Sequence, residues 1–215
     1  MDPRECPSGC RGSAETKPDP IGPRSAQAKE KTVPRLTAID PAHAEGKTKA
    51  LLDGVQKTLG MIPNLMATLA NAPAALEAYL SLGQALGKGR LDAKTREAIA
   101  LTVAGENGCD YCASAHTAVG ARLGVPRDEL AANLEGRSSD PTLAAILRFA
   151  RAVVVERGWV GDADLAEARA AGLDDGRVTE IVAAVAANIF SNYVNHVART
   201  EVDFPLVQTG RSQAA

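Results

Sequence analysis

The amino-acid sequence predicts an all-α fold of about eight helices, on three observations. Alanine, the residue with the highest helix propensity, occupies 40 of the 215 positions. Aromatic residues, which favour strands, make up only 3% of the chain, and no alternating run of β-branched residues is long enough for a strand. Helix-capping residues and glycines recur instead at intervals of about one helix length.

Four helices are predicted before the first half of the chain ends, each from a capping residue at its start. Asp40 is followed by Pro41, which suits a first helical turn, and Gly60 can adopt the left-handed conformation that ends a helix. Asn107-Gly108 breaks the last of the four. The expected helices and their candidate N-caps are 41–59 (Asp40), 64–69 (Asn64), 71–86 (Asn71) and 92–106 (Asp92).

The second half of the chain is predicted from the same signals and from apolar residues at helical spacing. Leu143, Ile146 and Leu147 illustrate that spacing after the start signal Asp140-Pro141. The last helix is expected to be the longest. The helices expected here are 109–124, 126–134, 140–154, 162–172 and 174–199.

Composition divides the chain into three parts. Residues 1–34 hold six of the twelve prolines, and their only large aliphatic residues are Met1, Ile21 and Val33. Such a segment buries too little apolar area to offset the entropy of ordering it. We therefore expect a disordered N-terminal tail over 1–34, an all-α domain over 35–205 and a frayed end over 206–215.

Charge and cysteine content narrow the class of protein. The formal net charge of −2 excludes a broad electrostatic footprint for nucleic acid or an anionic membrane. Apolar runs stay well below the ~18 residues of a membrane span, and the first thirty residues lack the apolar stretch of a signal peptide. Four cysteines are too few for a secreted disulfide scaffold. The expected location is the cytoplasm.

The chemistry of the chain is predicted to lie at Cys109 and Cys112. On a helix that begins at Cys109, both cysteines and His116 fall on one stripe. Thiols at positions i and i+3 can form a disulfide with little backbone movement. The helix dipole taken alone favours Cys109 as the more acidic thiol. His116 favours Cys112, because it lies one turn beyond that residue and can accept its proton.

Glu97 is the candidate partner of His116. It lies on the preceding helix among Ala100, Leu101 and Ala104, an unusual surrounding for a carboxylate. Because the link between the two helices is short, we expect them to fold back on each other, which places Glu97 and His116 about equally far from the turn. The pair is thus a candidate proton relay.

A pair of cysteines at this spacing also forms half of a zinc site. Completing such a site would need Cys6 and Cys10 from the tail, or convergence of His43, His116 and His196. A thioredoxin-type site is excluded because its motif belongs to a βαβ unit that the sequence lacks. We therefore expect neither a metal nor a cofactor, and we interpret Cys6 and Cys10 as exposed thiols.

The last predicted helix carries a second candidate feature. Asn188, Asn192 and Asn195 fall on one stripe beside an apolar face, although asparagine is a weak helix former. These residues are candidates for a pocket or a subunit interface near the cysteines, and a solvated helix face is an equally good interpretation. His196 is a candidate second base, with a structural role as the alternative.

The pattern Glu97-x11-Cys109-x2-Cys112-x3-His116 resembles the core motif of the AhpD-like alkylhydroperoxidases of the carboxymuconolactone decarboxylase superfamily. All four residues match that motif in type and spacing. The segments 61–65 and 188–196 are similar to the peroxidase-related subgroup of the superfamily. The resemblance covers roughly residues 35–205.

The resemblance implies a cysteine-based peroxidase whose all-α subunits assemble as trimers or hexamers. By motif position, Cys112 would attack the hydroperoxide and become a sulfenic acid, and Cys109 would resolve it as a disulfide. Glu97 and His116 would relay protons. The founding members carry a histidine where this chain has Tyr111, so one proton carrier is replaced.

We therefore predict a hydroperoxide reductase that is re-reduced by a dithiol or disulfide partner. It is expected to be a homo-oligomer with no nucleic-acid or membrane partner. Three alternatives stay open: a thiol–disulfide oxidoreductase, a lyase of the carboxymuconolactone decarboxylase type, and a non-catalytic redox-sensing helical oligomer. The superfamily's lactone decarboxylases generally lack the cysteine pair, which makes the lyase the weaker inheritance.

Overall fold

The structure is a computed structural model that describes residues 33–210. These residues belong to one compact unit that begins at Thr32. Most of the tail predicted over 1–34, with Cys6 and Cys10, lies outside the described residues. Val33 and Pro34, the last two residues of that prediction, are exposed.

The described residues form nine α-helices and one short 3₁₀ helix, with no strand among them, which confirms the all-α prediction. The 3₁₀ helix spans Pro41–His43. The α-helices are α1 (Gly46–Leu59), α2 (Asn64–Leu69), α3 (Pro73–Leu86), α4 (Ala93–Asn107), α5 (Asp110–Arg122), α6 (Arg127–Leu134), α7 (Pro141–Val155), α8 (Asp162–Ala170) and α9 (Asp175–Ala198).

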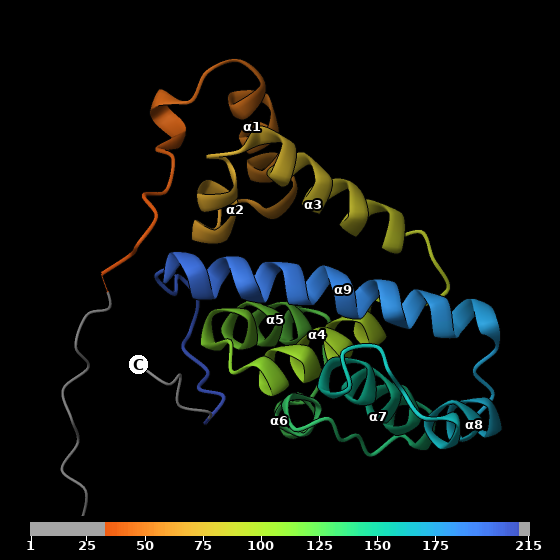
Figure 1. The fold of residues 1–215 in the computed structure, drawn as a ribbon. Helices are drawn as coiled ribbons and strands as arrows, with labels where there is room; N and C mark the ends of the chain where they lie inside the picture. The colour runs from red at the N-terminus through yellow and green to blue at the C-terminus, as the bar shows by residue number, and fades with distance from the viewer. Residues whose placement is uncertain (1–32, 211–215) are drawn as a thin grey trace, which may run out of the picture. The chain divides into compact units, whose positions relative to one another are not determined.

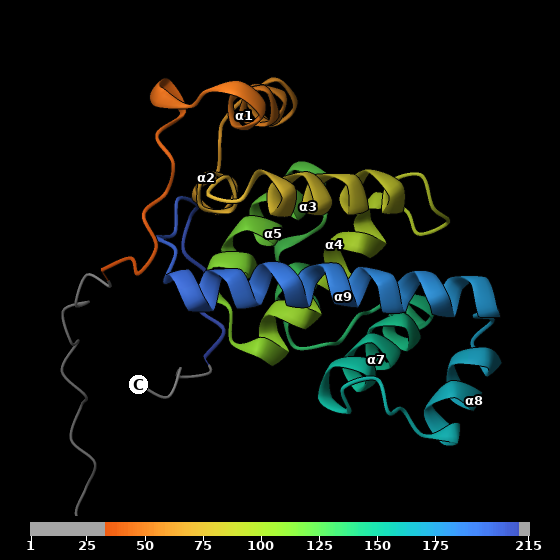
Figure 2. The same ribbon diagram turned by 45° about the horizontal axis from the view of Figure 1, so that its top comes forward.

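Helix α9 runs between two groups of helices (Figure 1). The first three helices lie on one side of it and α4 to α8 on the other. In the turned view α3 still lies alongside α9, and the two helices pack against each other (Figure 2). α4 contacts α5, α6, α7 and α9, so it forms the centre of the second group.

The burial of α4 follows from that central place. Every residue from Ala98 to Gly105 is buried, whichever way it points, and Ile99 and Val103 are completely buried. A helix covered on all sides needs no polar face, so its residues lack the one-sided pattern of a surface helix. Small residues on α4 let its neighbours approach closely.

Aspartate side chains cap three helices at the starts that the sequence predicted. Asp92 accepts a hydrogen bond from the Thr95 backbone N–H at 2.8 Å. Asp140 does the same for Leu143 at 2.7 Å. Asp174 caps α9 by accepting from the Arg177 backbone N–H at 2.9 Å. Each cap satisfies one of the N–H groups that the first turn leaves unpaired.

The helix predicted over 41–59 is divided in the structure, so that prediction is wrong at its start. The Asp40 side chain accepts from the Ala42 N–H, two residues away, and therefore caps only the 3₁₀ turn. Gly46 has a φ of +53°, outside the right-handed helical region, and it begins α1. The predicted end is confirmed, because Gly60 adopts the left-handed conformation with a φ of +77°.

Three further caps differ from prediction. Ala72, not Asn71, is the N-cap residue of α3, and the Asn71 side chain instead donates to the Thr37 and Thr68 carbonyls. Pro63, not Asn64, is the N-cap residue of α2, and the Asn64 side chain instead donates to the Glu201 carbonyl at 3.0 Å. Gly161 is the N-cap residue of α8, where Asp162 was expected. At Asn64 a long-range partner has displaced the local one, which spacing along the sequence does not reveal.

Residues 206–210 are anchored, so the predicted fraying from residue 206 is wrong for this part. The Val207 N–H donates to Ser114 Oγ of α5 at 2.8 Å. The Thr209 N–H and hydroxyl donate to Asp110 Oδ1 at 2.9 and 2.8 Å. This segment has no secondary structure, and side chains of α5 accept the hydrogen bonds of its backbone N–H groups. Residues 211–215 lie outside the described residues.

Helix α9 is the one helix among the described residues that is long and apolar enough, by length and composition, to cross a membrane. The core helix of a soluble protein meets the same test. α9 packs against five other helices, namely α2, α3, α4, α5 and α7.

Candidate active site

Helices α4, α5 and α9 meet at the candidate active site. Cys109 is the N-cap residue of α5 and Cys112 is the third residue of that helix, so both lie in its first turn. Gly108 ends α4 in the left-handed conformation, with a φ of +69°, and this tight turn brings α5 back against α4. His116 follows on α5, and Glu97 comes from α4.

The two thiols are buried and hydrogen-bonded to each other. The Cys109 thiol donates to Cys112 Sγ at 2.9 Å. The Cys112 backbone N–H donates to Cys109 Sγ at 3.4 Å. Only 1% of Cys109 and 2% of Cys112 are exposed, and both are free thiols. The pair is therefore positioned to form a disulfide.

This contact gives the two thiols opposite acidities. The hydrogen bond from Cys109 is the largest influence that lowers the pKa of Cys112, to about 7, and it outweighs burial. His116 and the amides of Asn195 and Asn192 lower this pKa further. The same hydrogen bond, and then burial, raises the pKa of Cys109, because losing the proton would break the contact. Cys112 is therefore the thiol that ionises first.

The N-cap position does not make Cys109 the more acidic thiol. Its sulfur accepts a backbone N–H of the first turn, as the helix-dipole argument expects. Its proton, however, is held by Cys112, and that interaction dominates the pKa of both residues. The lowered pKa of Cys112 agrees in direction with the sequence argument based on His116, although the hydrogen bond from Cys109 contributes more to it than the charge of His116.

Glu97 and His116 face each other across α4 and α5, as their spacing predicted. Glu97 Oε2 lies 2.7 Å from His116 Nδ1, and about a fifth of each side chain is exposed. Burial lowers the pKa of His116, but the charge of Glu97 and the hydrogen bond to it raise the pKa more, and the net shift is upward. The upward shift in the pKa of His116 favours its imidazolium form beside Cys112.

Two of the three predicted asparagines reach the cysteines. Asn195 Nδ2 donates to Cys112 Sγ at 3.2 Å, and Asn192 also lowers the pKa of that sulfur. Asn188 does not take part, because its Nδ2 donates to the Ala184 carbonyl of its own helix at 2.8 Å. Of the asparagine stripe on α9, only the part formed by Asn192 and Asn195 therefore lies at the site.

Tyr111 belongs to the buried cluster that contains both cysteines, but its hydroxyl group is bound elsewhere. The Tyr111 hydroxyl accepts from the Leu65 backbone N–H at 3.1 Å, and its ring packs edge-on against Phe204 at 5.9 Å between centroids. Burial raises the pKa of Tyr111. Burial lowers the pKa of His196, and Asp110, outside the cysteine pair, is the charge that acts on it. Tyr111 thus joins α5 to α2 and the C-terminal segment.

Tyr79 of α3 belongs to the site, although nothing in its sequence context indicates this. Burial raises its pKa to about 12, and the negative charges of Cys112 and Glu97 add to the shift. Its ring packs against Phe190 of α9, with 6.1 Å between centroids. Tyr79 therefore stays protonated beside the ionised thiol. An aromatic residue on an apolar helix face has the sequence signature of a core residue, which is why it was missed.

The described residues contain no group of three or more histidine, cysteine, aspartate or glutamate residues arranged to hold a metal ion. His43 is exposed and pairs with Asp40, with 2.8 Å between His43 Nδ1 and Asp40 Oδ2. His116 is bound to Glu97. Cys6 and Cys10, the other proposed zinc ligands, lie outside the described residues.

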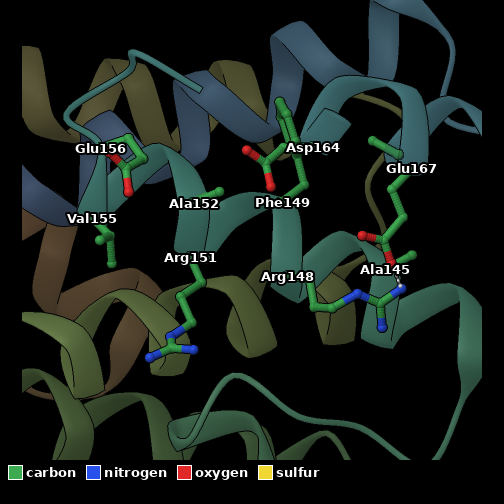
Figure 3. A pocket seen from close by; sticks show the side chains of 10 residues that line it. Ala145, Arg148, Phe149, Arg151, Ala152, Val155, Glu156, Asp164 and Glu167 are labelled. Carbon is green, nitrogen blue, oxygen red and sulfur yellow. Dashed lines mark ion pairs between the residues drawn. The ribbon is translucent and has the colours of Figure 1, made fainter. Parts of the chain in front are cut away.

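A hollow of about 330 Å³ lies between α7 and α8, apart from the cysteines (Figure 3). Arg148 and Glu167 form an ion pair across it at 2.6 Å, and Arg151 points from α7 toward Glu106, to which it is bound. Arg148 and Glu167 thus pair with each other, while Arg151 pairs with a residue outside the lining. None of the predicted site residues lines this hollow.

Solved structures share this fold. A crystal structure from Ralstonia eutropha, described as an alkylhydroperoxidase AhpD core and an uncharacterized peroxidase-related protein, is 24% identical with a TM-score of 0.72. It covers 81% of this chain and 94% of its own. The debrominase Bmp8 is 22% identical with a TM-score of 0.68, covering 79% and 92% of the two chains. At this level of identity the likeness shows the fold.

The sequence itself matches a family over the part that contains the site. Residues 73–156 match the carboxymuconolactone decarboxylase family. This match covers less than half of the chain, so it shows a resemblance to the family in the helical core alone. The matched stretch contains both site cysteines, Glu97 and His116.

A curated relative is known from Haemophilus influenzae, an uncharacterized protein that is 56% identical over 45 residues. The match spans 20% of this chain and 40% of the relative. It therefore extends over less than half of that protein's length.

Proposed function

We propose that this protein is a cysteine-based hydroperoxide reductase of the AhpD/carboxymuconolactone decarboxylase superfamily. The observation that carries the proposal is the pairing of an acidic thiol, Cys112 with a pKa of about 7, with a second thiol 2.9 Å away. An acidic thiol is ionised at neutral pH and can attack an electrophile, and a neighbouring thiol can resolve the product.

The first step oxidises Cys112. Its thiolate attacks one oxygen of the hydroperoxide, the O–O bond breaks, and the sulfur becomes a sulfenic acid while the other oxygen leaves as an alkoxide. The alkoxide takes a proton and departs as an alcohol. His116 supports this step as the proton donor, because Glu97 holds its Nδ1 and raises its pKa, which leaves Nε2 to deliver the proton.

The second step forms the disulfide. The Cys109 sulfur attacks the sulfenic sulfur of Cys112, the S–O bond breaks, and the oxygen leaves as water after taking up a proton. The contact at 2.9 Å supports this role, since the sulfurs need little movement to bond. A dithiol then reduces the disulfide, supplying two electrons and two protons and becoming a disulfide itself.

The burial of both sulfurs favours a small substrate over a protein disulfide. With 1% and 2% of Cys109 and Cys112 exposed, a bulky disulfide would have to displace helices in order to reach them. A lyase of the decarboxylase type would leave both thiols unused, and a redox sensor would not turn over.

The proposal is tested by counting thiols. In a background with Cys6→Ser and Cys10→Ser, one equivalent of hydroperoxide should remove two thiols rapidly, and dithiothreitol should restore them. Cys109→Ser should still consume about one equivalent and stall with a sulfenic acid trapped by dimedone on Cys112.

Cys112→Ser should react no faster than an ordinary exposed thiol. Rapid loss of Cys109 in that variant would reverse the roles of the two cysteines. Slow thiol loss in the parent protein, at the rate of free cysteine, would contradict the proposed peroxidase activity.

We further propose that the protein is a homo-oligomer of three or six subunits. α9 carries exposed apolar residues on one face, Val182, Phe190, Tyr193 and Val197, and such a face favours burial against another copy. Sedimentation equilibrium should give a trimer or hexamer, and Val197→Lys should shift it toward smaller species. A monomer in the parent protein at micromolar concentration would contradict this.

The proposed location is the cytoplasm, where reduced thiol carriers are available to regenerate the site. Cell fractionation with the thiols trapped at lysis should place the protein, largely reduced, in the cytoplasmic fraction. Recovery mainly from the membrane fraction would contradict it.

A further inference from the structure

The last turns of α9 present two buried amides to Cys112. Asn195 is 4% exposed and donates through Nδ2 to Cys112 Sγ at 3.2 Å. Asn192 is completely buried, one turn earlier on the same helix. Both side chains lie eighty or more residues from the cysteines in sequence, so helix packing alone places them there.

The orientation of Asn192 is set by Asn107. Asn107 Nδ2, at the end of α4, donates to Asn192 Oδ1 at 2.9 Å. Because the carbonyl oxygen of the amide is taken, its Nδ2 points the other way. Among the described residues this Nδ2 has no hydrogen-bond partner, yet Asn192 is one of the groups that lower the pKa of Cys112.

An unpaired buried N–H is unfavourable and is rarely retained without a reason. A neutral thiol is a weak acceptor, already bound by the Cys109 proton and the Asn195 amide. A thiolate carries a full negative charge and can accept more donors, and hydrogen bonds to ions are the strong ones. The unpaired Nδ2 of Asn192 thus suits the ionised sulfur better than the neutral one.

We propose that Asn192 and Asn195 form a two-amide cradle that stabilises the Cys112 thiolate, and that Asn107 is the positioning residue that turns the Asn192 amide toward the sulfur. This inference deepens the proposed function, on which it rests, by adding to the Cys–His–Glu set three residues that tune the attacking thiol. The cradle acts through donated hydrogen bonds, independently of the charge of His116.

The test is the pH dependence of Cys112 alkylation by iodoacetamide, measured by peptide-resolved mass spectrometry on the reduced protein with Cys6→Ser and Cys10→Ser. The parent should show a midpoint near pH 7. Asn195→Ala and Asn192→Ala should each raise the midpoint by about one pH unit, a tenfold loss of thiolate below the midpoint.

Variants of Asn107 distinguish a positioning role from a merely structural one. Asn107→Ala should raise the midpoint less than Asn192→Ala. Asn107→Asp should raise it more than Asn107→Ala, because a carboxylate accepts the NH₂ group of Asn192 and turns its carbonyl oxygen toward the sulfur. Asn107 is only partly buried, so these variants are expected to fold even where a deletion in α9 does not.

Asn188→Ala is the matched control. It is the same change one turn earlier on α9, where the amide is bonded to the Ala184 carbonyl, and the midpoint should stay at the parent value. A parent-like midpoint in folded Asn195→Ala and Asn192→Ala, or a shift in Asn188→Ala as large as theirs, overturns the cradle. So does Asn107→Asp with the midpoint of Asn107→Ala.

Alkylation separates this inference from the proposed function. If the midpoints shift as expected but the parent consumes no peroxide, the result supports the cradle and contradicts the hydroperoxide reductase. If the parent consumes peroxide while the midpoints of the asparagine variants do not move, the result supports the reductase and contradicts the cradle.

Discussion

Cys112 is surrounded by groups that all act on one sulfur. Cys109 donates its thiol proton, Asn195 donates an amide hydrogen, and His116 contributes positive charge. The helix N-terminus also acts on this pair, since the Cys109 sulfur accepts a backbone N–H of the first turn of α5. What distinguishes the two cysteines is the direction of the hydrogen bond between the thiols. This hydrogen bond raises the pKa of the donor, Cys109, and lowers the pKa of the acceptor, Cys112.

The lowered pKa of Cys112 predicts how its reactivity changes with pH. Because the folded pKa is about 7 instead of 9.0, the thiolate is present above pH 7 and is lost as the pH falls through that value. The rate of peroxide consumption should therefore drop about tenfold per unit below pH 6 and level off by about pH 8. A stopped-flow series from pH 5 to 10 measures it. A midpoint near 9 would show that the neighbours do not acidify the sulfur.

Removing the Glu97 charge should break its ion pair with His116 and weaken the contribution of both residues to the reaction. In Glu97→Gln the pKa of His116 should fall, because the charge that raises it is gone, and the imidazolium beside Cys112 should be lost. We expect peroxide consumption at pH 7 to slow by roughly 10²-fold, with a similar loss in His116→Ala. The double variant should be little slower than either single one, since both serve one relay.

Glu77→Gln is the control for that measurement. Glu77 is half exposed, pairs with Lys47 on the surface and should be replaceable without effect on the rate. Additive losses in the double variant would mean that Glu97 and His116 act separately.

At the scale of elements, the site depends on how closely helices approach α4. Gly105 of α4 lies against the Leu134 carbonyl at the end of α6, and an added Cβ would overlap that oxygen. Thr102 Oγ1 donates to the neighbouring Asn133 carbonyl at 2.8 Å, which fixes α6 on the same side. α5 meets α6 in the same way, because a Cβ on Gly120 would meet the Leu130 side chain.

Gly105→Ala is therefore expected to destabilise the fold, although alanine is the better helix former. The overlap is with backbone, which cannot rotate away, so we expect a loss of about 1–3 kcal/mol in the free energy of unfolding. Gly83→Ala in α3 is the matched control, because nothing lies within 4 Å of an added Cβ there, and it should stabilise by about 0.5–1 kcal/mol. Urea unfolding measures both. Equal effects in the two variants would contradict the close approach of α6.

At the scale of the whole molecule, the described C-terminal segment fastens the start of α5. Val207 and Thr209 hydrogen-bond to Ser114 and Asp110, while Phe204 packs on Tyr111. The first turn of α5 is also the turn that carries both thiols. A chain end is thus part of the support of the site.

Deleting residues 206–215 should lower the stability by about 2 kcal/mol, because it removes the hydrogen bonds that Val207 and Thr209 donate to α5, each worth about 0.5–1.5 kcal/mol. For a chain of this size the thermal midpoint should fall by about 4–8 °C. Differential scanning calorimetry measures the shift. Deleting only 211–215 leaves these contacts in place and is the control, so an equal fall in both would show that the anchored residues contribute nothing.

Much of the secondary structure and the centre of the site could be predicted because both depend on short-range geometry. Asp92 caps α4 by bonding an N–H three residues on, and Cys109, Cys112 and His116 share a stripe because a helix returns every three to four residues. Glu97 meets His116 because the Asn107-Gly108 turn is too short for any other arrangement. The cap at Asp40 failed where the local signal was ambiguous, since the same residue can begin a 3₁₀ turn.

The sequence by itself thus determined the all-α class and the alignment of two thiols, a histidine and a carboxylate. Only the tertiary structure placed the Asn195 amide against Cys112 while Asn188 stays bonded to its own helix, packed Tyr79 against the cluster that holds the cysteines, and set the direction of the hydrogen bond between the thiols. The reason is physical. Helical periodicity places residues on a face, but which part of that face meets another helix depends on side-chain packing across the core, and the direction of a hydrogen bond between two identical thiols depends on every group around them.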